Sequence, residues 1–84
     1  MNKSILKKKI LYRSQYRGTK EMDLLLGSFV NKYIDSFNAT ELQELITILN
    51  VDDEILYKWY LDKKLEHKFL KGKVAKKLKQ FRLN

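Results

Sequence analysis

Side chains that commonly perform catalysis are few in this chain of 84 residues. There is no cysteine, which excludes thiolate nucleophiles, disulfide bonds and thiolate metal sites. The single histidine, His67, stands among lysines and is expected to be a solvated surface residue. Three adjacent acids, Asp52, Asp53 and Glu54, suit a helix N-terminus better than acid–base chemistry, which needs carboxylates facing each other across a cleft. With no glycine-rich phosphate loop either, the sequence predicts a protein that is not an enzyme, holds no metal and binds no cofactor tightly by itself.

A second group of polar residues, between positions 17 and 23, is better suited to contacts than to catalysis. Arg17 offers five donors in a planar fork that matches carboxylates or backbone carbonyls. Gly18 directly follows a predicted helix, where a left-handed conformation would leave bare backbone that a partner can approach closely. Glu21 and Asp23 follow within one turn, near enough to orient Arg17 or to meet a partner. Spacing alone nevertheless favours a plainer alternative, in which Gly18 only ends the helix and Arg17 is solvated.

Short amphipathic helices are expected to position these residues. The chain has no proline and only three glycines, which favours helix over a many-turned β fold. Apolar residues recur at three- and four-residue spacings, and no alternating pattern indicates a strand. Helices are predicted over about residues 2–17, 22–37 with Glu21 already in the first turn, 38–50, from 52 or 53 onward, and 65–82. Gly72 weakens the first half of the last helix, so a later start is the alternative there. The expected fold is therefore all-α, a small five-helix bundle in which residues 1–84 form a single domain.

Particular residues are expected to hold these helices together. Asn38 and Glu41 have the spacing of a capping box at the start of the third helix. Gly27 lies inside the second helix, at a cost of about 1 kcal/mol relative to alanine, and close packing of another helix would explain it. Phe29 is part of the apolar side of the second helix, and Trp59 is expected in the core. The apolar sides of the first and fourth helices are predicted to comprise Ile5, Leu6, Ile10, Tyr12, Ile55, Leu56, Trp59 and Tyr60.

Charge is distributed along the chain in three blocks. Residues 1–20 carry seven bases and no acid, residues 21–62 carry nine acids against two lysines, and residues 63–84 carry nine bases against one acid. For the last block a solvated helix face is favoured, ahead of contact with an anionic partner or membrane surface and ahead of nucleic-acid binding. The third and fourth helices could imitate a helix-turn-helix, but acids at the start of the fourth would repel phosphates. No nucleic-acid partner is therefore expected.

A targeting segment is an alternative interpretation of the basic N-terminal region, residues 1–20. Its basic composition is similar to that of a mitochondrial presequence. Its apolar residues nevertheless continue a helical pattern, so the segment is expected to belong to the domain. No apolar run approaches the roughly 20 residues that span a bilayer, so no transmembrane segment is expected.

Two motifs resemble those of a known family. The stretch Arg17-Gly18-Thr19-Lys20-Glu21-Met22-Asp23 resembles the Arg-Gly-x-x-Glu-x-Asp signature of the succinate dehydrogenase assembly factor 2 family, small factors that promote covalent flavin attachment. The stretch from Asp52 to Tyr60 resembles the later acidic and aromatic motif of that family, although Glu54 stands where many relatives have proline. The motifs lie about 30 residues apart, as in the family, and the resemblance covers roughly residues 5–62.

The resemblance implies a five-helix bundle that binds the flavoprotein subunit of succinate dehydrogenase, and in some bacteria fumarate reductase. It would assist covalent attachment of FAD to a histidine of that subunit, with the chemistry supplied by FAD and the client. A monomer is expected, in the cytoplasm of a bacterium or in the mitochondrial matrix of a eukaryote. The alternative left open is a small basic nucleic-acid-binding helical protein. The expected partner contacts are Arg17, Gly18, Glu21, Asp23, Asp52 and Asp53, with Asp53 also capping the fourth helix and Asp52 free to meet the client.

Overall fold

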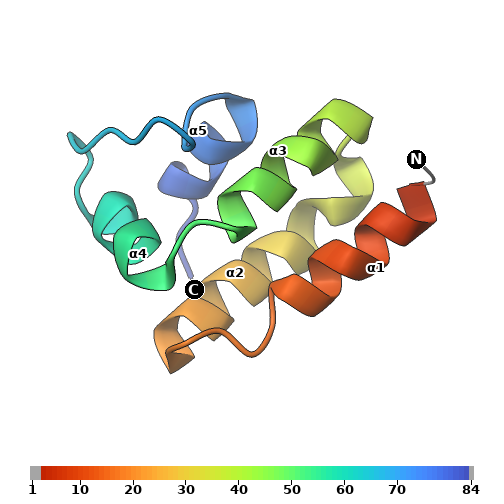
Figure 1. The fold of residues 1–84 in the computed structure, drawn as a ribbon, viewed down its shortest axis with the longest axis horizontal. Helices are drawn as coiled ribbons and strands as arrows, with labels where there is room; N and C mark the ends of the chain where they lie inside the picture. The colour runs from red at the N-terminus through yellow and green to blue at the C-terminus, as the bar shows by residue number, and fades with distance from the viewer. Residues whose placement is uncertain (1–2, 84) are drawn as a thin grey trace.

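Helices account for all the regular structure in the described part of this chain. The computed structural model describes residues 3–83, and within them five α-helices and one short 3₁₀ helix follow one another without a strand (Figure 1). This confirms the predicted all-α class and the five-helix bundle. The elements are α1 (Lys3–Arg13), α2 (Lys20–Tyr33), η1 (Ile34–Ser36), α3 (Ala39–Leu49), α4 (Asp53–Leu61) and α5 (Lys73–Gln80).

The third helix, α3, lies at the centre of the bundle. It packs against α1 on one side and α5 on the other, while α2 packs against α1 (Figure 1). Its start is fixed by the predicted capping box, in which Asn38 and Glu41 exchange two hydrogen bonds of 2.9 Å between side chains and backbone amides. The helix against which the others pack therefore has a well-defined beginning.

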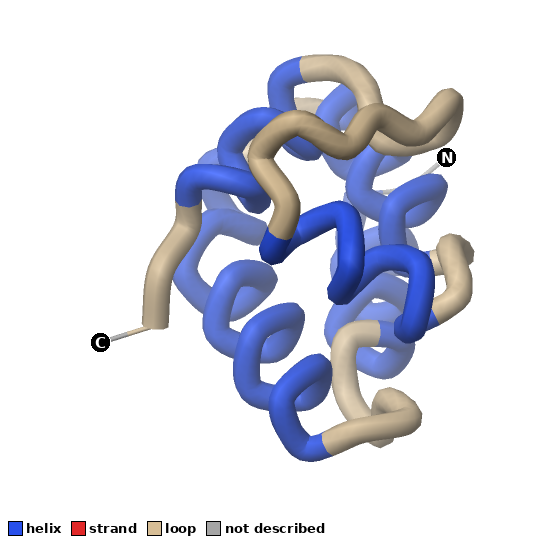
Figure 2. The backbone as a smooth tube through the Cα atoms, turned by 90° about the vertical axis from the view of Figure 1, so that its left-hand side faces the viewer, coloured by secondary structure: helices blue, strands red, loops and turns tan. Residues whose placement is uncertain are grey.

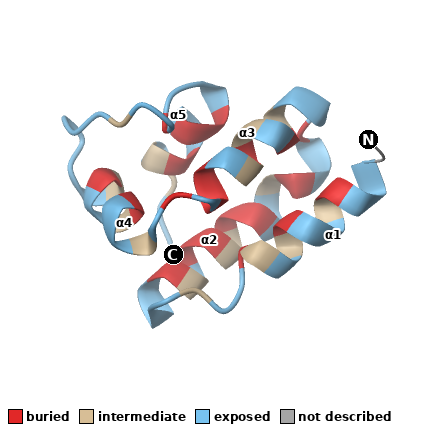
Figure 3. Cartoon of the chain, viewed as in Figure 1, coloured by how far each residue is buried: buried red, intermediate tan, exposed pale blue. Residues whose placement is uncertain are grey.

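The apolar core runs through all five helices. Buried residues lie on the inward sides of the helices (Figure 3). Phe29 of α2 is fully buried, and its ring centroid lies 5.1 Å from that of Tyr33, 6.2 Å from that of Phe37 and 5.4 Å from that of Phe81. Because Phe81 follows α5, this aromatic cluster closes the C-terminal segment onto α2. Trp59 of α4 is 2% exposed and lies in the same core, as the sequence analysis expects.

Two helices are shorter than predicted at an end. The first ends at Arg13 rather than at residue 17, because the Ser14 hydroxyl donates to the Leu11 carbonyl at 2.9 Å and turns the chain away. Its predicted start, residue 2, lies outside the described residues. The second changes to a 3₁₀ turn at Ile34, and Phe37 is extended. Ile5, Tyr12 and Ile55, predicted on apolar sides, are exposed because these short helices bury only a narrow stripe.

The last helix begins later than the predicted residue 65. Residues 62–72 form a loop that crosses from α4 to α5 on the side of the bundle seen in Figure 2. Gly72 ends this loop with a φ of 112° and a ψ of −179°, a conformation that is essentially restricted to glycine. A Cβ atom there would overlap the Oε1 atom of Glu44 on α3, so without its glycine the loop would require that side chain to move.

The other glycine expected to serve packing does not do so. Apart from the backbone of its own helical turn and its two chain neighbours, none of the described residues has an atom within 4 Å of the position that a Cβ of Gly27 would occupy, and Gly27 is partly exposed. The prediction that another helix packs closely there is therefore wrong. Within residues 3–83, no helix is both long and apolar enough to cross a bilayer.

Candidate functional site

Asp53 joins the two sequence motifs. It is the first residue of α4, and its carboxylate meets the loop of residues 14–19 that connects α1 to α2. The Nε atom of Arg17 donates to Oδ1 of Asp53 at 2.8 Å, and the NH2 group of Arg17 forms an ion pair with the same oxygen at 2.5 Å. The backbone amide of Gly18 donates to Oδ2 at 2.6 Å. Both carboxylate oxygens are thus held by the first motif.

Asp53 does not act as the cap that the sequence suggested. The capping position belongs to Asp52, whose side chain forms no capping hydrogen bond. The carboxylate of Asp53 points to the loop instead, because a paired guanidinium and an amide offer it three donors. Asp52 remains exposed at the surface, as the sequence analysis expects.

Arg17 forms hydrogen bonds and an ion pair within this chain. Besides its ion pair, its NH1 group donates to the carbonyl of Arg13 at the end of α1, at 2.8 Å. Its backbone amide donates to Oδ1 of Asp23 in the first turn of α2. The side chain of Arg17 is only 12% exposed and that of Asp53 only 19%. The plainer alternative of a solvated arginine is therefore wrong. Within this chain the guanidinium of Arg17 is paired with Asp53 and the Arg13 carbonyl, and its contact with a partner stays a prediction.

The left-handed residue at this corner is Tyr16 rather than Gly18. Within residues 3–83 a positive φ occurs at Tyr16, with 57°, and at Gly72, so the prediction for Gly18 is wrong. A Cβ at Gly18 would lie 3.3 Å from Oδ2 of Asp53, a tight contact that would require the carboxylate to shift by a few tenths of an ångström. A positive φ is uncommon for a bulky side chain, and such conformations concentrate at functional sites. The backbone at Tyr16 turns that aromatic ring outward, where it is 84% exposed.

The outer surface of this corner combines aromatic rings with acids. Tyr12, at the end of α1, is 74% exposed. Glu21 in the first turn of α2 is exposed and forms no side-chain hydrogen bond or ion pair with the rest of the described chain. Thr19 caps α2 by accepting a hydrogen bond from the Met22 amide at 3.2 Å. Sequence reasoning overlooked Tyr16, because a left-handed tyrosine has no signature in the residues around it. We name Tyr12, Tyr16, Gly18, Glu21 and Asp52 the corner surface.

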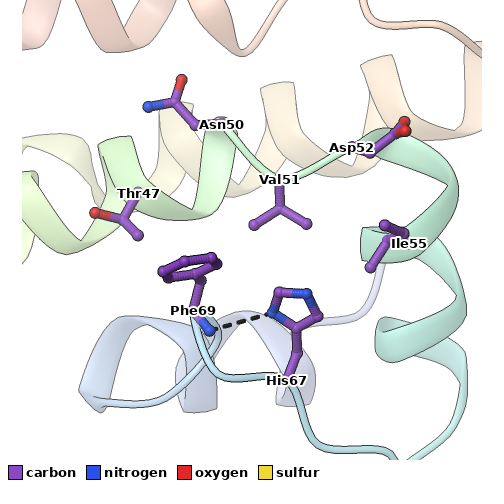
Figure 4. Close-up of a pocket in the computed structure, with 7 residues that line it drawn as sticks. All are labelled: Thr47, Asn50, Val51, Asp52, Ile55, His67 and Phe69. Atoms are coloured by element: carbon purple, nitrogen blue, oxygen red, sulfur yellow. Dashed lines mark hydrogen bonds between the residues drawn. The ribbon is translucent and has the colours of Figure 1, made fainter.

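An apolar hollow adjoins the corner surface at Asp52. It lies between the turn from α3 to α4 and the loop of residues 62–72 (Figure 4). Ile55 and Phe69, both exposed apolar residues, line it together with the partly buried His67. Nδ1 of His67 accepts a hydrogen bond from the Phe69 amide at 3.1 Å, which stabilises the loop. His67 is therefore a structural residue of the loop and not the fully solvated one expected from sequence.

The geometry of the corner suits recognition of another protein. Within residues 3–83 no group of three or more histidine or acidic side chains is placed to hold a metal ion. The polar groups beneath the surface, Arg17, Asp23 and Asp53, satisfy one another and fix the backbone of the loop. The exposed Tyr12 and Tyr16 offer a partner apolar area, and the exposed carboxylates of Glu21 and Asp52 offer hydrogen-bond acceptors.

The comparisons with known proteins agree with the two motifs. Residues 8–82 match the model of a family described as the flavinator of succinate dehydrogenase. Over 80 residues, which cover 90% of this chain and 49% of the relative, the chain is 35% identical to the mitochondrial succinate dehydrogenase assembly factor 2 of Saccharomyces cerevisiae. It is 40% identical to the Dictyostelium discoideum protein of the same name over 58 residues, 69% of this chain and 41% of that one.

The Arabidopsis thaliana protein of that name is 39% identical over 51 residues, covering 61% of this chain and 27% of the relative. The chain thus spans about half the length, or less, of these curated relatives. No solved structure matches it. The family match covers both motifs and the helices between them, and this chain therefore belongs to the family described as the flavinator of succinate dehydrogenase.

Proposed function

We propose that this chain docks onto the flavoprotein subunit of succinate dehydrogenase and promotes the covalent attachment of FAD to it. The description of its family and the names of its relatives support the proposal. The chain acts as a monomer, by binding, and catalyses no step itself. FAD belongs to the client, and this chain holds none tightly on its own. Where a cell makes fumarate reductase, the flavoprotein subunit of that enzyme is a second client.

The observation that carries the proposal is the junction of both motifs at Asp53. Residues separated by more than 30 positions meet there, and one carboxylate holds the side chain of Arg17 and the amide of Gly18 together. These contacts lie just beneath the corner surface and fix its backbone. A preformed surface loses less conformational entropy on binding, which favours association with a large partner.

The buried and the exposed residues of the corner have different roles in this proposal. Arg17, Asp23 and Asp53 position the loop, because their polar groups are paired within the chain. Tyr12 and Tyr16 supply apolar contact area, since exposed aromatic residues often dominate the free energy of protein interfaces. The acids at positions 21 and 52 set the orientation by pairing with donors of the client.

The test is flavin attachment in cells that produce this chain together with the flavoprotein subunit. Covalent flavin on that subunit is read by fluorescence in a denaturing gel. Tyr12→Ala combined with Glu21→Lys is expected to lower the signal at least about tenfold, because an interface typically depends on a few anchoring residues. Both positions are exposed, so the free energy of unfolding should change by no more than about 0.5 kcal/mol at each.

Control substitutions are available outside the corner surface and the hollow beside it. Leu61→Ala combined with Glu66→Lys removes one exposed apolar side chain and reverses one exposed acid, and neither residue lines that hollow. This pair should leave flavin attachment unchanged. Full flavin attachment with the Tyr12→Ala and Glu21→Lys pair, or equal losses with both pairs, would show that the client does not dock at the corner surface.

A further inference from the structure

Bases in the last third of the chain lack acidic partners. Residues 63–82 carry nine lysines and arginines against the single acid Glu66. Among residues 3–83, ion pairs join Lys7 to Asp35 and Arg17 to Asp53, and neither involves a base of this segment. Like charges this close repel one another, and the repulsion raises the free energy of the folded state unless an anion is bound.

Four of these bases line one hollow beside α5. Lys63 comes from the loop after α4, Lys76 and Lys79 come from α5, and Arg82 follows that helix. Among residues 3–83, Gln80 is the only other residue that lines the hollow, and none of the lining residues is acidic. The hollow shares no residue with the corner surface. We name these five residues the cationic hollow.

Two of the four cations are held in place by neutral groups. The Nζ atom of Lys79 donates to the Leu65 carbonyl at 2.8 Å and lies 4.6 Å from the centroid of the Trp59 ring. The NH1 group of Arg82 donates to the Tyr60 hydroxyl at 3.1 Å and to the Lys79 carbonyl at 2.9 Å. Neither contact neutralises the charge, so both cations stay available to an anion at fixed positions.

The other two cations are free to close on a ligand. Lys63 and Lys76 are exposed, and their side chains form no hydrogen bond or ion pair with the described residues. Their long, flexible stems can bring ammonium groups onto an anion that Lys79 and Arg82 have positioned. The arrangement therefore combines two anchored charges with two mobile ones around a single hollow.

We propose that the cationic hollow binds the phosphate groups of a ligand of the diphosphate class. Four cations from three chain segments suit compact phosphate groups with several negative charges. A hollow lined by charges of one sign concentrates the electrostatic potential inside it. A second hollow adjoins this one, shares Lys63, Lys76 and Lys79 with it, and is lined in addition by Lys64, Lys71 and the acid Glu66. Arg82, one of the two anchored cations, lines the cationic hollow and not the adjoining one, which favours a compact ligand there over a polynucleotide that follows a continuous cationic track. The inference does not rest on the proposed flavin function, because it uses none of the corner residues.

The chain contains a reporter for this site. Trp59 is the only tryptophan, and Lys79 of the hollow lies over its ring. Inorganic pyrophosphate added to the full chain at constant ionic strength should change the tryptophan fluorescence along a saturable curve. Chloride at the same ionic strength should produce no such curve. A linear response, or the same response with chloride, would overturn the proposal.

Two matched pairs of substitutions test the location. Lys63→Gln with Lys76→Gln should raise the dissociation constant for pyrophosphate about tenfold or more, since each charge-assisted hydrogen bond can contribute about that factor. Lys8→Gln with Lys9→Gln removes the same amount of charge from exposed positions on α1. This pair should change the dissociation constant for pyrophosphate less than about twofold, because distant exposed charges are screened by salt. If both pairs weaken pyrophosphate binding equally, the effect comes from net charge alone, and the proposed site is wrong.

Further ligands identify which kind of molecule carries the phosphate groups. Riboflavin, FMN and FAD carry no phosphate, one phosphate and a diphosphate, so rising affinity along this series supports a soluble dinucleotide. Stronger binding to phosphatidylglycerol vesicles than to pyrophosphate would overturn the proposal, because each of these lipids carries a single phosphate, and would assign the hollow to a membrane surface. Single-stranded RNA tests for a diffuse nucleic-acid surface. If the affinity grows with RNA length and falls equally with both pairs of substitutions, the chain binds nucleic acid over a broad surface and the proposed site is wrong.

Discussion

Asp53 shows how one side chain can connect distant parts of a short chain. Its partners Arg17 and Gly18 precede it by 36 and 35 positions, and they belong to a loop rather than to a helix. The ion pair is largely shielded from water, so losing one member would leave the other charge with neither a partner nor full hydration. The stability of the loop therefore depends on this carboxylate.

Replacing Asp53 by alanine is expected to lower the free energy of unfolding by about 2–3 kcal/mol. The loss arises because the guanidinium of Arg17 and the amide of Gly18 lose their acceptor while staying partly buried. Denaturant unfolding followed by circular dichroism measures it. Asp52→Ala is the control, since that exposed side chain forms no capping hydrogen bond, and it should change stability by less than about 0.5 kcal/mol. Equal effects at both positions would contradict the role given to Asp53.

The sequence could indicate that residues 17–23 and 52–60 matter, but not how they meet. Arg17 was expected to offer its donors to a partner because no acid that could pair with it is recognisable at a distance of 36 positions. The left-handed conformation was assigned to Gly18 because glycine adopts it most readily. Tyr16 adopts it instead. Such an assignment depends on the path that the chain takes between two packed helices, which local preferences do not determine.

The predicted helix boundaries agree with the structure where they depend on residues that are close together in the sequence. The capping box of Asn38 and Glu41 uses groups three residues apart, so the sequence contains all of it. The end of α1 depends on Ser14, which is buried between packed helices, and neither its burial nor its backbone hydrogen bond was evident beforehand. The start of α5 at Gly72 depends on a backbone with a positive φ, and the path of the preceding loop, not the residues around the glycine, determines that conformation.

Two glycines should respond in opposite directions to alanine. Gly27 lies in the interior of α2 with open space around it, so Gly27→Ala should raise the free energy of unfolding by about 0.5–1 kcal/mol through helix propensity. Gly72→Ala should lower it by about 1–3 kcal/mol, because the backbone there is strained for any other residue and a Cβ would strike Glu44.

Thermal unfolding of the two alanine variants beside the parent chain measures both effects. Each 1 kcal/mol corresponds to a shift of about 4–8 °C in the midpoint for a domain of this size. A stabilised Gly72→Ala chain would mean that the loop before α5 has another conformation in solution. A destabilised Gly27→Ala chain would mean that something packs against that face of α2.

At the scale of the whole molecule, the basic C-terminal segment is part of the core. Leu70, Val74, Ala75 and Leu78 are buried, although lysines cover the rest of the segment. The Tyr60 hydroxyl donates to the carbonyl of Phe81, which ties the end of the chain to α4. The resemblance covered only about residues 5–62, so the segment beyond it could have been an appendage. Its buried side chains predict instead that the motif-bearing part needs it in order to fold.

A chain that ends at Asp62 is therefore expected to lose cooperative unfolding. Each large apolar side chain removed with α5 contributes roughly 1.5–3 kcal/mol by burial, and the stability of a domain of this length is only about 4–13 kcal/mol. Thermal denaturation followed by circular dichroism should change from a sigmoidal transition to a gradual slope, and amide proton resonances should lose their dispersion. A chain that ends at Arg82 is the control and should melt like the parent. A sigmoidal transition of the shorter chain within about 5 °C of the parent would show that the first 62 residues fold alone, and the cationic hollow would then belong to an accessory segment.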